Sequence, residues 1–157
     1  MANTMRWRYG ETCPVMLPVD SGTVIEIGDL IYLDTDDAKP AGAQPDQGTE
    51  GSNQQLFHDN FAGVAMQASR TGDTQPIRIA TSGVFEFDCV STTLEVGDLM
   101  SSDENGGGTA LLNGTVVKVS NANAAIGRCA KRLNPAGTHV LVDIVSGVLK
   151  GGPQAVL

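Results

Sequence analysis

The sequence Val24-Ile25-Glu26-Ile27-Gly28-Asp29-Leu30 returns later in the chain as Thr93-Leu94-Glu95-Val96-Gly97-Asp98-Leu99. In both copies a short apolar run ends in Gly-Asp-Leu. Glycine permits a turn, and an aspartate side chain can accept hydrogen bonds from the backbone N–H groups that follow it. We therefore interpret each copy as a strand, a turn and the start of a second strand. A pair of catalytic carboxylates, Asp29 and Asp98, is the alternative, but turn chemistry explains both copies without it.

Two further motifs recur in the same order after these copies. Residues 62–65 (AGVA) are similar to residues 126–129 (IGRC), and the sequence SGV occurs at 82–84 and again at 146–148. The step from the glycine of the first motif to the glycine of the second is 20 residues in both copies. We infer an internal duplication that covers about 24–88 and 93–148.

Strand patterns dominate the rest of the chain. Segments of alternating apolar residues rich in β-branched side chains predict strands. The clearest lie at 77–79, 84–89, 115–119 and 140–145. The only helical candidates are short, at 54–60 and 122–126. The sequence therefore predicts an all-β fold with one or two short helices, arranged as a compact β-barrel or β-sandwich of two related units in a single domain over residues 21–157.

Composition and charge exclude several classes of protein. The chain has 157 residues, of which 41% are hydrophobic and only 4% aromatic, so that aliphatic side chains must fill the core. The net charge of −8 disfavours nucleic acid as a partner, because an acidic surface repels phosphate. No apolar run approaches the ~18 residues that a membrane span needs, and no signal peptide is recognisable. We expect synthesis in the cytoplasm and no membrane partner.

Two loops and one turn are predicted from glycine, proline and polar residues. The stretch 35–52 lacks an apolar pattern and predicts an exposed, mobile loop between strands. In the second copy a shorter loop at 101–109 contains three consecutive glycines. Asn113-Gly114 lies between two apolar runs and predicts a two-residue hairpin turn.

The reactive side chains are few and scattered. Cys13, Cys89 and Cys129 are an odd number with wide spacing, and we expect them to be buried, reduced and apolar in character. His58 and His139 stand outside any metal-binding spacing. We therefore expect neither residue to hold a metal ion.

One acidic run, residues 34–37, is a candidate metal site. Residues 34–37 (DTDD) could bind calcium through oxygen ligands, but they lack the glycine and distal glutamate of an EF-hand loop. A solvated acidic loop is the preferred interpretation. Because nucleophile elbows and phosphate-binding glycine motifs are also missing from the sequence, we expect no catalytic residues, no cofactor and no enzymatic activity.

The N-terminal segment, residues 1–20, is predicted to be an edge strand or an extended arm, because its prolines lack the N–H that a central strand needs. It contains Arg6, Trp7, Arg8 and Tyr9 in succession. Tryptophan, tyrosine and arginine dominate the energetics of protein interfaces, so these four residues are candidate partner-binding residues. The alternative is that Trp7 packs over the end of its own barrel.

The order of the glycine-based motifs resembles that of a known family. The motifs are 28–30, 61–65, 77–79, 83–87, 97–99, 126–129 and 140–142. Together they resemble the small capsid decoration (cement) proteins encoded in head-gene clusters of tailed bacteriophages and prophages, many of them first described as an uncharacterised phage family. The resemblance covers roughly residues 20–148.

This resemblance implies a structural role without catalysis. It implies a β-rich subunit on the outer capsid surface of the virion, bound to the major capsid protein after the shell expands. It also implies a homotrimer that reinforces the head against the pressure of the packaged DNA. Another virion module, such as a head fibre base or a tail-associated protein, is an alternative. A small β-barrel enzyme or ligand-binding protein is a third hypothesis, and it would need a deep cleft lined by Asp34, Asp36 and His58.

Overall fold

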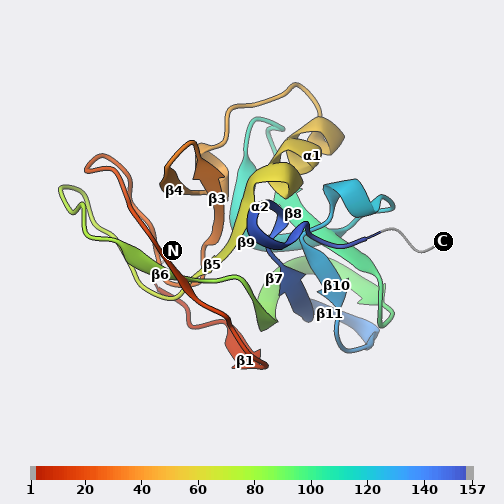
Figure 1. Cartoon of the computed structure of the whole chain (residues 1–157). Coiled ribbons are helices and arrows are strands. Elements are labelled where there is room, and N and C mark those ends of the chain that lie inside the picture. The colour runs from red at the N-terminus through yellow and green to blue at the C-terminus, as the bar shows by residue number, and fades with distance from the viewer. Residues whose placement is uncertain (1–2, 155–157) are drawn as a thin grey trace.

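The computed structural model describes residues 3–154, and these residues form a mainly β structure (Figure 1). The strands of the first half are β1 (Trp7–Tyr9), β2 (Val15–Leu17), β3 (Leu30–Asp34), β4 (Asp37–Pro40), β5 (Phe61–Ala65) and β6 (Ile77–Ala80). Those of the second half are β7 (Ser82–Leu94), β8 (Leu99–Glu104), β9 (Leu111–Lys118), β10 (Gly127–Cys129) and β11 (Leu133–Val145). The helices are α1 (Glu50–Asn60), α2 (Gly147–Lys150) and two 3-10 turns, η1 (Ala41–Ala43) and η2 (Ala122–Ala124).

The strands form two sheets that repeat one arrangement. One sheet has the order β2-β6-β5-β3-β4, and the other has the order β1-β7-β11-β10-β8-β9. Without β1, the two orders correspond strand for strand along the chain. A further pairing between β9 and β7, at Thr115 and Asp88, closes the second set into a five-stranded barrel. The predicted all-β fold of two related units is therefore confirmed.

The register of the strands confirms that the two units are related in detail. Leu30 pairs with Val64 in the first unit, and Leu99 pairs with Arg128 in the second. The recurring unit runs from β2 to β6 and again from β7 to β11, so that it includes the second half of the N-terminal segment. In the first unit β2 and β4 occupy the places of the closing strands β7 and β9. Among the residues that the structure describes, they are linked there by one backbone hydrogen bond, from Ala38 N–H to the Pro18 carbonyl at 2.9 Å.

The two Gly-Asp motifs form the same turn. Gly28 and Gly97 have φ of 95° and 92°, which a side chain would strain. The Asp29 carboxylate accepts a hydrogen bond from Glu26 N–H at 2.9 Å, and Asp98 accepts one from the equivalent Glu95 N–H at 2.9 Å. The predicted turn is confirmed, with one correction, since each aspartate binds the N–H three residues before it and not those that follow.

The predicted loop over residues 35–52 is mostly regular structure instead. It contains β4, η1 and the first residues of α1, and Ala38 and Ala41 are fully buried. Thr49 begins α1 by accepting a hydrogen bond from Ser52 N–H. The prediction failed because small alanines in a polar stretch carry little apolar signal, although they pack where larger side chains would not enter. The helix predicted at 54–60 is confirmed and is longer, whereas that at 122–126 is only the turn η2.

The predicted hairpin turn at Asn113-Gly114 is wrong, because both residues lie inside the continuous strand β9. The pairing of β9 with β8 is irregular at this point, between Ser102 and Glu104 of the partner strand. The Asn113 side chain accepts a hydrogen bond from Gly42 N–H at 2.7 Å. A tertiary contact of the asparagine therefore replaces the local turn that the dipeptide favours.

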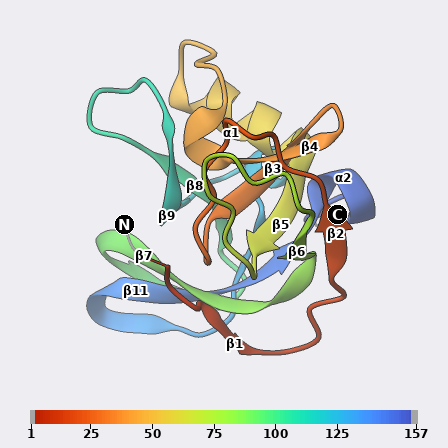
Figure 2. The same cartoon turned by 90° about the vertical axis from the view of Figure 1, so that its left-hand side faces the viewer.

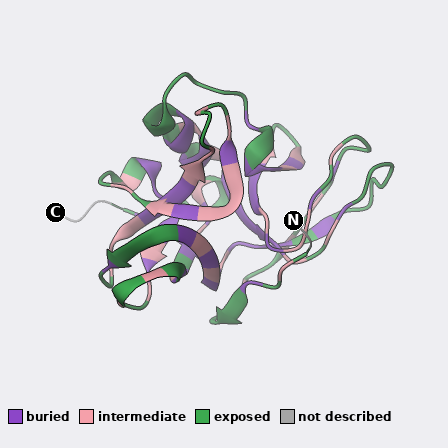
Figure 3. Cartoon of the chain, turned by 180° about the vertical axis from the view of Figure 1, so that it is seen from behind, coloured by how far each residue is buried: buried purple, intermediate pink, exposed green. Residues whose placement is uncertain are grey.

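The core joins the two units, and its buried residues gather between the sheets (Figure 3). An aliphatic cluster that includes Ile25, Ile31 and Ile79 fills the first unit. The larger cluster combines the interior of the second barrel with α1 and β5, where the Phe57 and Phe61 rings are 5.4 Å apart. All four phenylalanines are buried, so their rings lie within a mostly aliphatic core.

Candidate interaction surface

The N-terminal segment follows the outer edges of both sheets. β1 pairs with β7, where Trp7 is opposite Phe85, and β2 pairs with β6. Between them, Thr81 N–H donates to the Thr12 carbonyl at 2.8 Å. Figure 2 shows β1 lying below the layer formed by β7 and β11. Of the two predictions for this segment, the edge strand is what the structure shows.

Arg6 lies inside the fold, with only 8% of its surface exposed. Its Nε donates to the Gly28 carbonyl at 3.0 Å, and its Nη1 donates to the Glu86 carbonyl at 3.3 Å. The guanidinium also stands 5.6 Å from the centre of the Phe87 ring. A Cβ on Gly114 would come within 2.2 Å of Arg6 Nη2, so a larger residue there would displace the guanidinium. Arg6 thus connects the turn of the first unit to two strands of the second.

The charge of Arg6 is retained despite this burial. Burial lowers its pKa from the ordinary value, while Asp88 and Asp29 nearby act in the opposite direction. Because the pKa of arginine is ordinarily far above neutrality, the guanidinium stays protonated. Arg6 is therefore a structural cation, and only the other three predicted partner-binding residues are on the surface.

Trp7 and Tyr9 are exposed, by 40% and 52%. The Trp7 indole Nε1 donates to the Gly10 carbonyl at 3.0 Å, which holds the ring in one orientation against its own turn. Met5 and Met16 on the same segment are also about half exposed, at 49% and 54%. Four of the nine exposed large hydrophobic side chains of residues 3–154 therefore belong to this segment.

Arg8 covers the free edge of β1. Its Nη1 donates to the carbonyls of Met5 and Trp7 at 3.1 and 3.2 Å, and its Nη2 forms an ion pair with Glu86 at 2.8 Å. A charged side chain that occupies edge carbonyls hinders the addition of another strand. The side chains of β1 are therefore more accessible to another molecule than its backbone is.

A groove of about 530 Å³ lies beside β1, between β1 and the turn that joins β10 to β11. Arg8 and Tyr9 form one wall, and Lys131, Arg132 and Leu133 form the other. We refer to this feature as the basic groove. Sequence reasoning missed the turn residues, because they lie far along the chain from β1 and a Lys-Arg pair alone carries no signal for a site.

The cleft required by the enzyme hypothesis is not assembled. Asp34 and Asp36 lie at the exposed β3–β4 turn, whereas His58 is buried on α1 against the Ala125 carbonyl. The pocket that includes Asp34 contains neither Asp36 nor His58. The structure thus separates the three residues that this hypothesis places together.

The cysteines and the metal candidates have simple surroundings. All three cysteines are free, and Cys89 and Cys129 are buried as predicted. The prediction is wrong for Cys13, which is exposed because it lies in the irregular link between the edge strands β1 and β2. Within residues 3–154 no three metal-ligating side chains lie together, and no helix there is long and apolar enough to cross a membrane.

Comparison of the chain with models of protein families and with curated proteins finds no match to either.

Proposed function

We propose that this protein is a structural virion protein, an external decoration (cement) protein that binds the major capsid protein of a tailed bacteriophage head. The family resemblance of the glycine-based motifs supplies the class of partner. The observation that carries the proposal in the structure is the exposure of Trp7 and Tyr9 on an edge strand that is fixed at both ends.

Rigidity is what makes this edge suitable for binding. The buried Arg6 anchors β1 to both units, and the Trp7 indole is already hydrogen-bonded in its exposed position. A side chain that is ordered before binding loses less conformational entropy when the partner arrives. Exposed tryptophan and tyrosine on a rigid support have the properties of interface hot spots.

Binding to capsids tests the proposal directly. Purified protein is mixed with expanded, undecorated capsids assembled from the major capsid protein of the same genome, and binding is measured by co-sedimentation. We expect saturable binding and a higher disruption temperature of the decorated particles. The absence of any retention on these capsids would reject the proposed function.

Substitution of Trp7 tests the role of the edge strand. Trp7→Ala should weaken capsid binding by about 2 kcal/mol or more, because a hot-spot ring is removed. Leu149→Ala is the matched control, since Leu149 is also about half exposed, at 49%, but lies on α2. Unchanged affinity of a folded Trp7→Ala protein would assign the ring to packing against its own barrel.

A further inference from the structure

The charges of this chain are divided unevenly between its two units. Residues 1–80 contain 11 acidic and 5 basic side chains, whereas residues 81–157 contain 7 acidic and 5 basic ones. Most of the net charge of −8 therefore belongs to the half that contains the first unit. An uneven distribution of this kind can orient association between molecules.

The acidic excess gathers at one end of the first unit. We call Asp20, Asp36, Asp37 and Asp73 the acidic end. The loop of Asp20 and the loop of Asp73 are joined by the hydrogen bond from Gly72 N–H to the Ser21 carbonyl at 2.7 Å. The carboxyl group of Asp20 lies close to that of Asp37 and raises the pKa of Asp37. Carboxylates held this close repel each other, and an external cation would relieve the repulsion.

The exposed turn between β3 and β4 forms the tip of the acidic end. β3 and β4 form a tight hairpin in which Asp34 is opposite Asp37, so that only Thr35 and Asp36 lie beyond the last pair. Lys39 neutralises Asp34 through an ion pair of 2.8 Å. Among residues 3–154 no cation lies within ion-pair distance of Asp36 or Asp37, so both carboxylates can pair with the cations of a second molecule.

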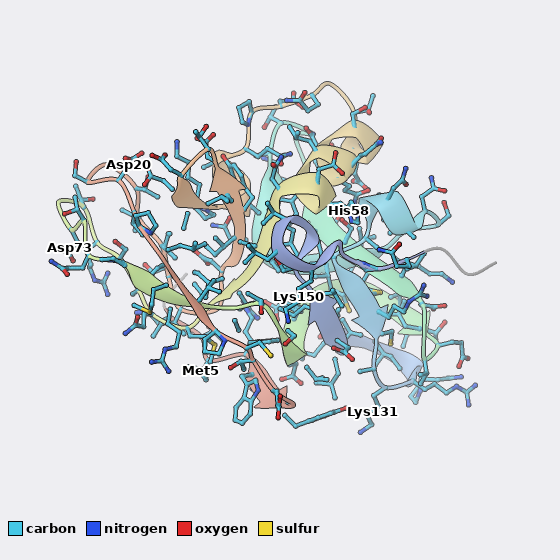
Figure 4. The ribbon with its side chains drawn as sticks, viewed as in Figure 1. Met5, Asp20, His58, Asp73, Lys131 and Lys150 are labelled. Carbon is cyan, nitrogen blue, oxygen red and sulfur yellow. The ribbon has the colours of Figure 1, made fainter. Side chains whose placement is uncertain are left out.

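The basic groove lies at the other end of the molecule. Figure 4 shows Asp20 and Asp73 on the left and Lys131 at the lower right. Three cations line the groove, against Glu86 as its single carboxylate. Among residues 3–154, Lys131 has no carboxylate within ion-pair distance. The pairs formed by Arg8 and Arg132 are exposed, so they contribute little and can be exchanged for other carboxylates.

We propose that the basic groove of one copy binds the acidic end of a second copy, in a head-to-tail contact. The groove is concave and basic, the tip is an exposed acidic turn, and one chain carries both. Because the two surfaces are different and lie at opposite ends, a bound pair still has one free groove and one free tip. Such a contact continues into a closed ring or an open chain. The inference does not depend on the proposed function.

Sedimentation velocity on the purified full chain tests this contact. We expect concentration-dependent association at about 0.05 M salt that weakens at about 0.5 M, since exposed charge pairs are screened. The double variants Lys131→Glu with Arg132→Glu and Asp36→Lys with Asp37→Lys should each weaken association at least about tenfold. Controls are Lys150→Glu on α2 and Asp59→Lys on α1, which lie outside both surfaces and should leave association unchanged.

Mixing the two double variants gives the decisive measurement. The reversed tip would be basic and the reversed groove acidic, so the mixture should recover association that neither variant shows alone. A wild-type chain that stays monomeric at low salt and several hundred micromolar overturns the proposal. So does a loss of association in the groove variant without any effect of the tip variant, which would assign the groove to a different acidic surface of the second copy. Circular dichroism confirms that each variant is folded.

Discussion

At the scale of single residues, Arg6 shows how one buried cation can join two structural units. Among residues 3–154 it is the only buried Lys or Arg side chain. It contacts the Gly28 carbonyl, the Glu86 carbonyl and the Phe87 ring at the same time. Removal of a buried charge leaves its partners unsatisfied, which costs more than the hydrogen bonds alone.

Replacement of this arginine should therefore destabilise the protein strongly. Arg6→Met keeps the length and apolar volume of the side chain but removes its donors and its charge. We expect the free energy of unfolding in urea to fall by about 2–4 kcal/mol. Arg8→Met is the control, because its exposed ion pair with Glu86 should contribute less than about 1 kcal/mol. Equal effects of the two substitutions would contradict the role assigned to Arg6.

The duplicated aspartates provide a second experiment at this scale. Burial raises the pKa of Asp29 above its ordinary value of 3.8, with a smaller contribution from Glu26, and the backbone hydrogen bond and Arg6 only partly oppose this. The native state therefore binds this proton more tightly than the unfolded state does. The contribution of Asp29 to stability is most favourable below pH 3.8 and is lost as the pH rises through the raised native pKa.

Asp29→Asn should remove this pH dependence and leave the turn in place, because the amide oxygen can still accept the bond from Glu26 N–H. We expect the difference in stability between variant and wild type to shift in favour of the variant as the pH rises above about 4. Asp98→Asn at the equivalent turn is the matched control, which loses an ion pair with Lys118 instead. Urea unfolding across this pH range measures both, and parallel curves for Asp29→Asn and wild type would refute the expectation.

At the scale of elements, the sequence predicts those structures whose cause is local. The Gly-Asp turns recur because a positive φ and a carboxylate acceptor are properties of the motif itself. The hairpin expected at Asn113-Gly114 does not form, because contacts of that strand with Gly42 and Arg6 outweigh the preference of two residues. The basic groove could not be predicted from the sequence either, because the fold of the second unit is what brings β1 and the β10–β11 turn together.

The start of α1 is a local signal that can be tested in isolation. Thr49 caps the helix by accepting a hydrogen bond from Ser52 N–H at 3.2 Å. Thr49→Ala should lower the free energy of unfolding by about 1 kcal/mol, whereas Thr49→Ser should retain most of the stability. Thermal and urea unfolding of both variants measure the difference. An alanine variant as stable as wild type would show that tertiary packing of α1 makes the cap dispensable.

At the scale of the whole molecule, the two units share a topology but differ in how firmly they are closed. The second unit is built on β7 and β11, each of 13 residues, and a strand pair closes its barrel. The strands of the first unit have three to five residues, and one backbone bond stands at the corresponding place. The sequence duplication predicts the shared topology, but it does not predict this difference, which depends on strand lengths set by tertiary pairing.

This difference predicts the order in which the molecule opens. Backbone amides of β7 and β11 should exchange with solvent most slowly, because their opening requires loss of the closed barrel, whereas those of β3 and β5 should exchange through a smaller opening of the first unit. Native-state hydrogen exchange in low urea measures both. In Arg6→Met the difference in exchange protection between the two units should increase, because the variant lacks the cation that connects the first turn to β7. Equal protection of both sheets in wild type and variant would mean that the units open as one body, joined by the shared phenylalanine core more than by the arginine.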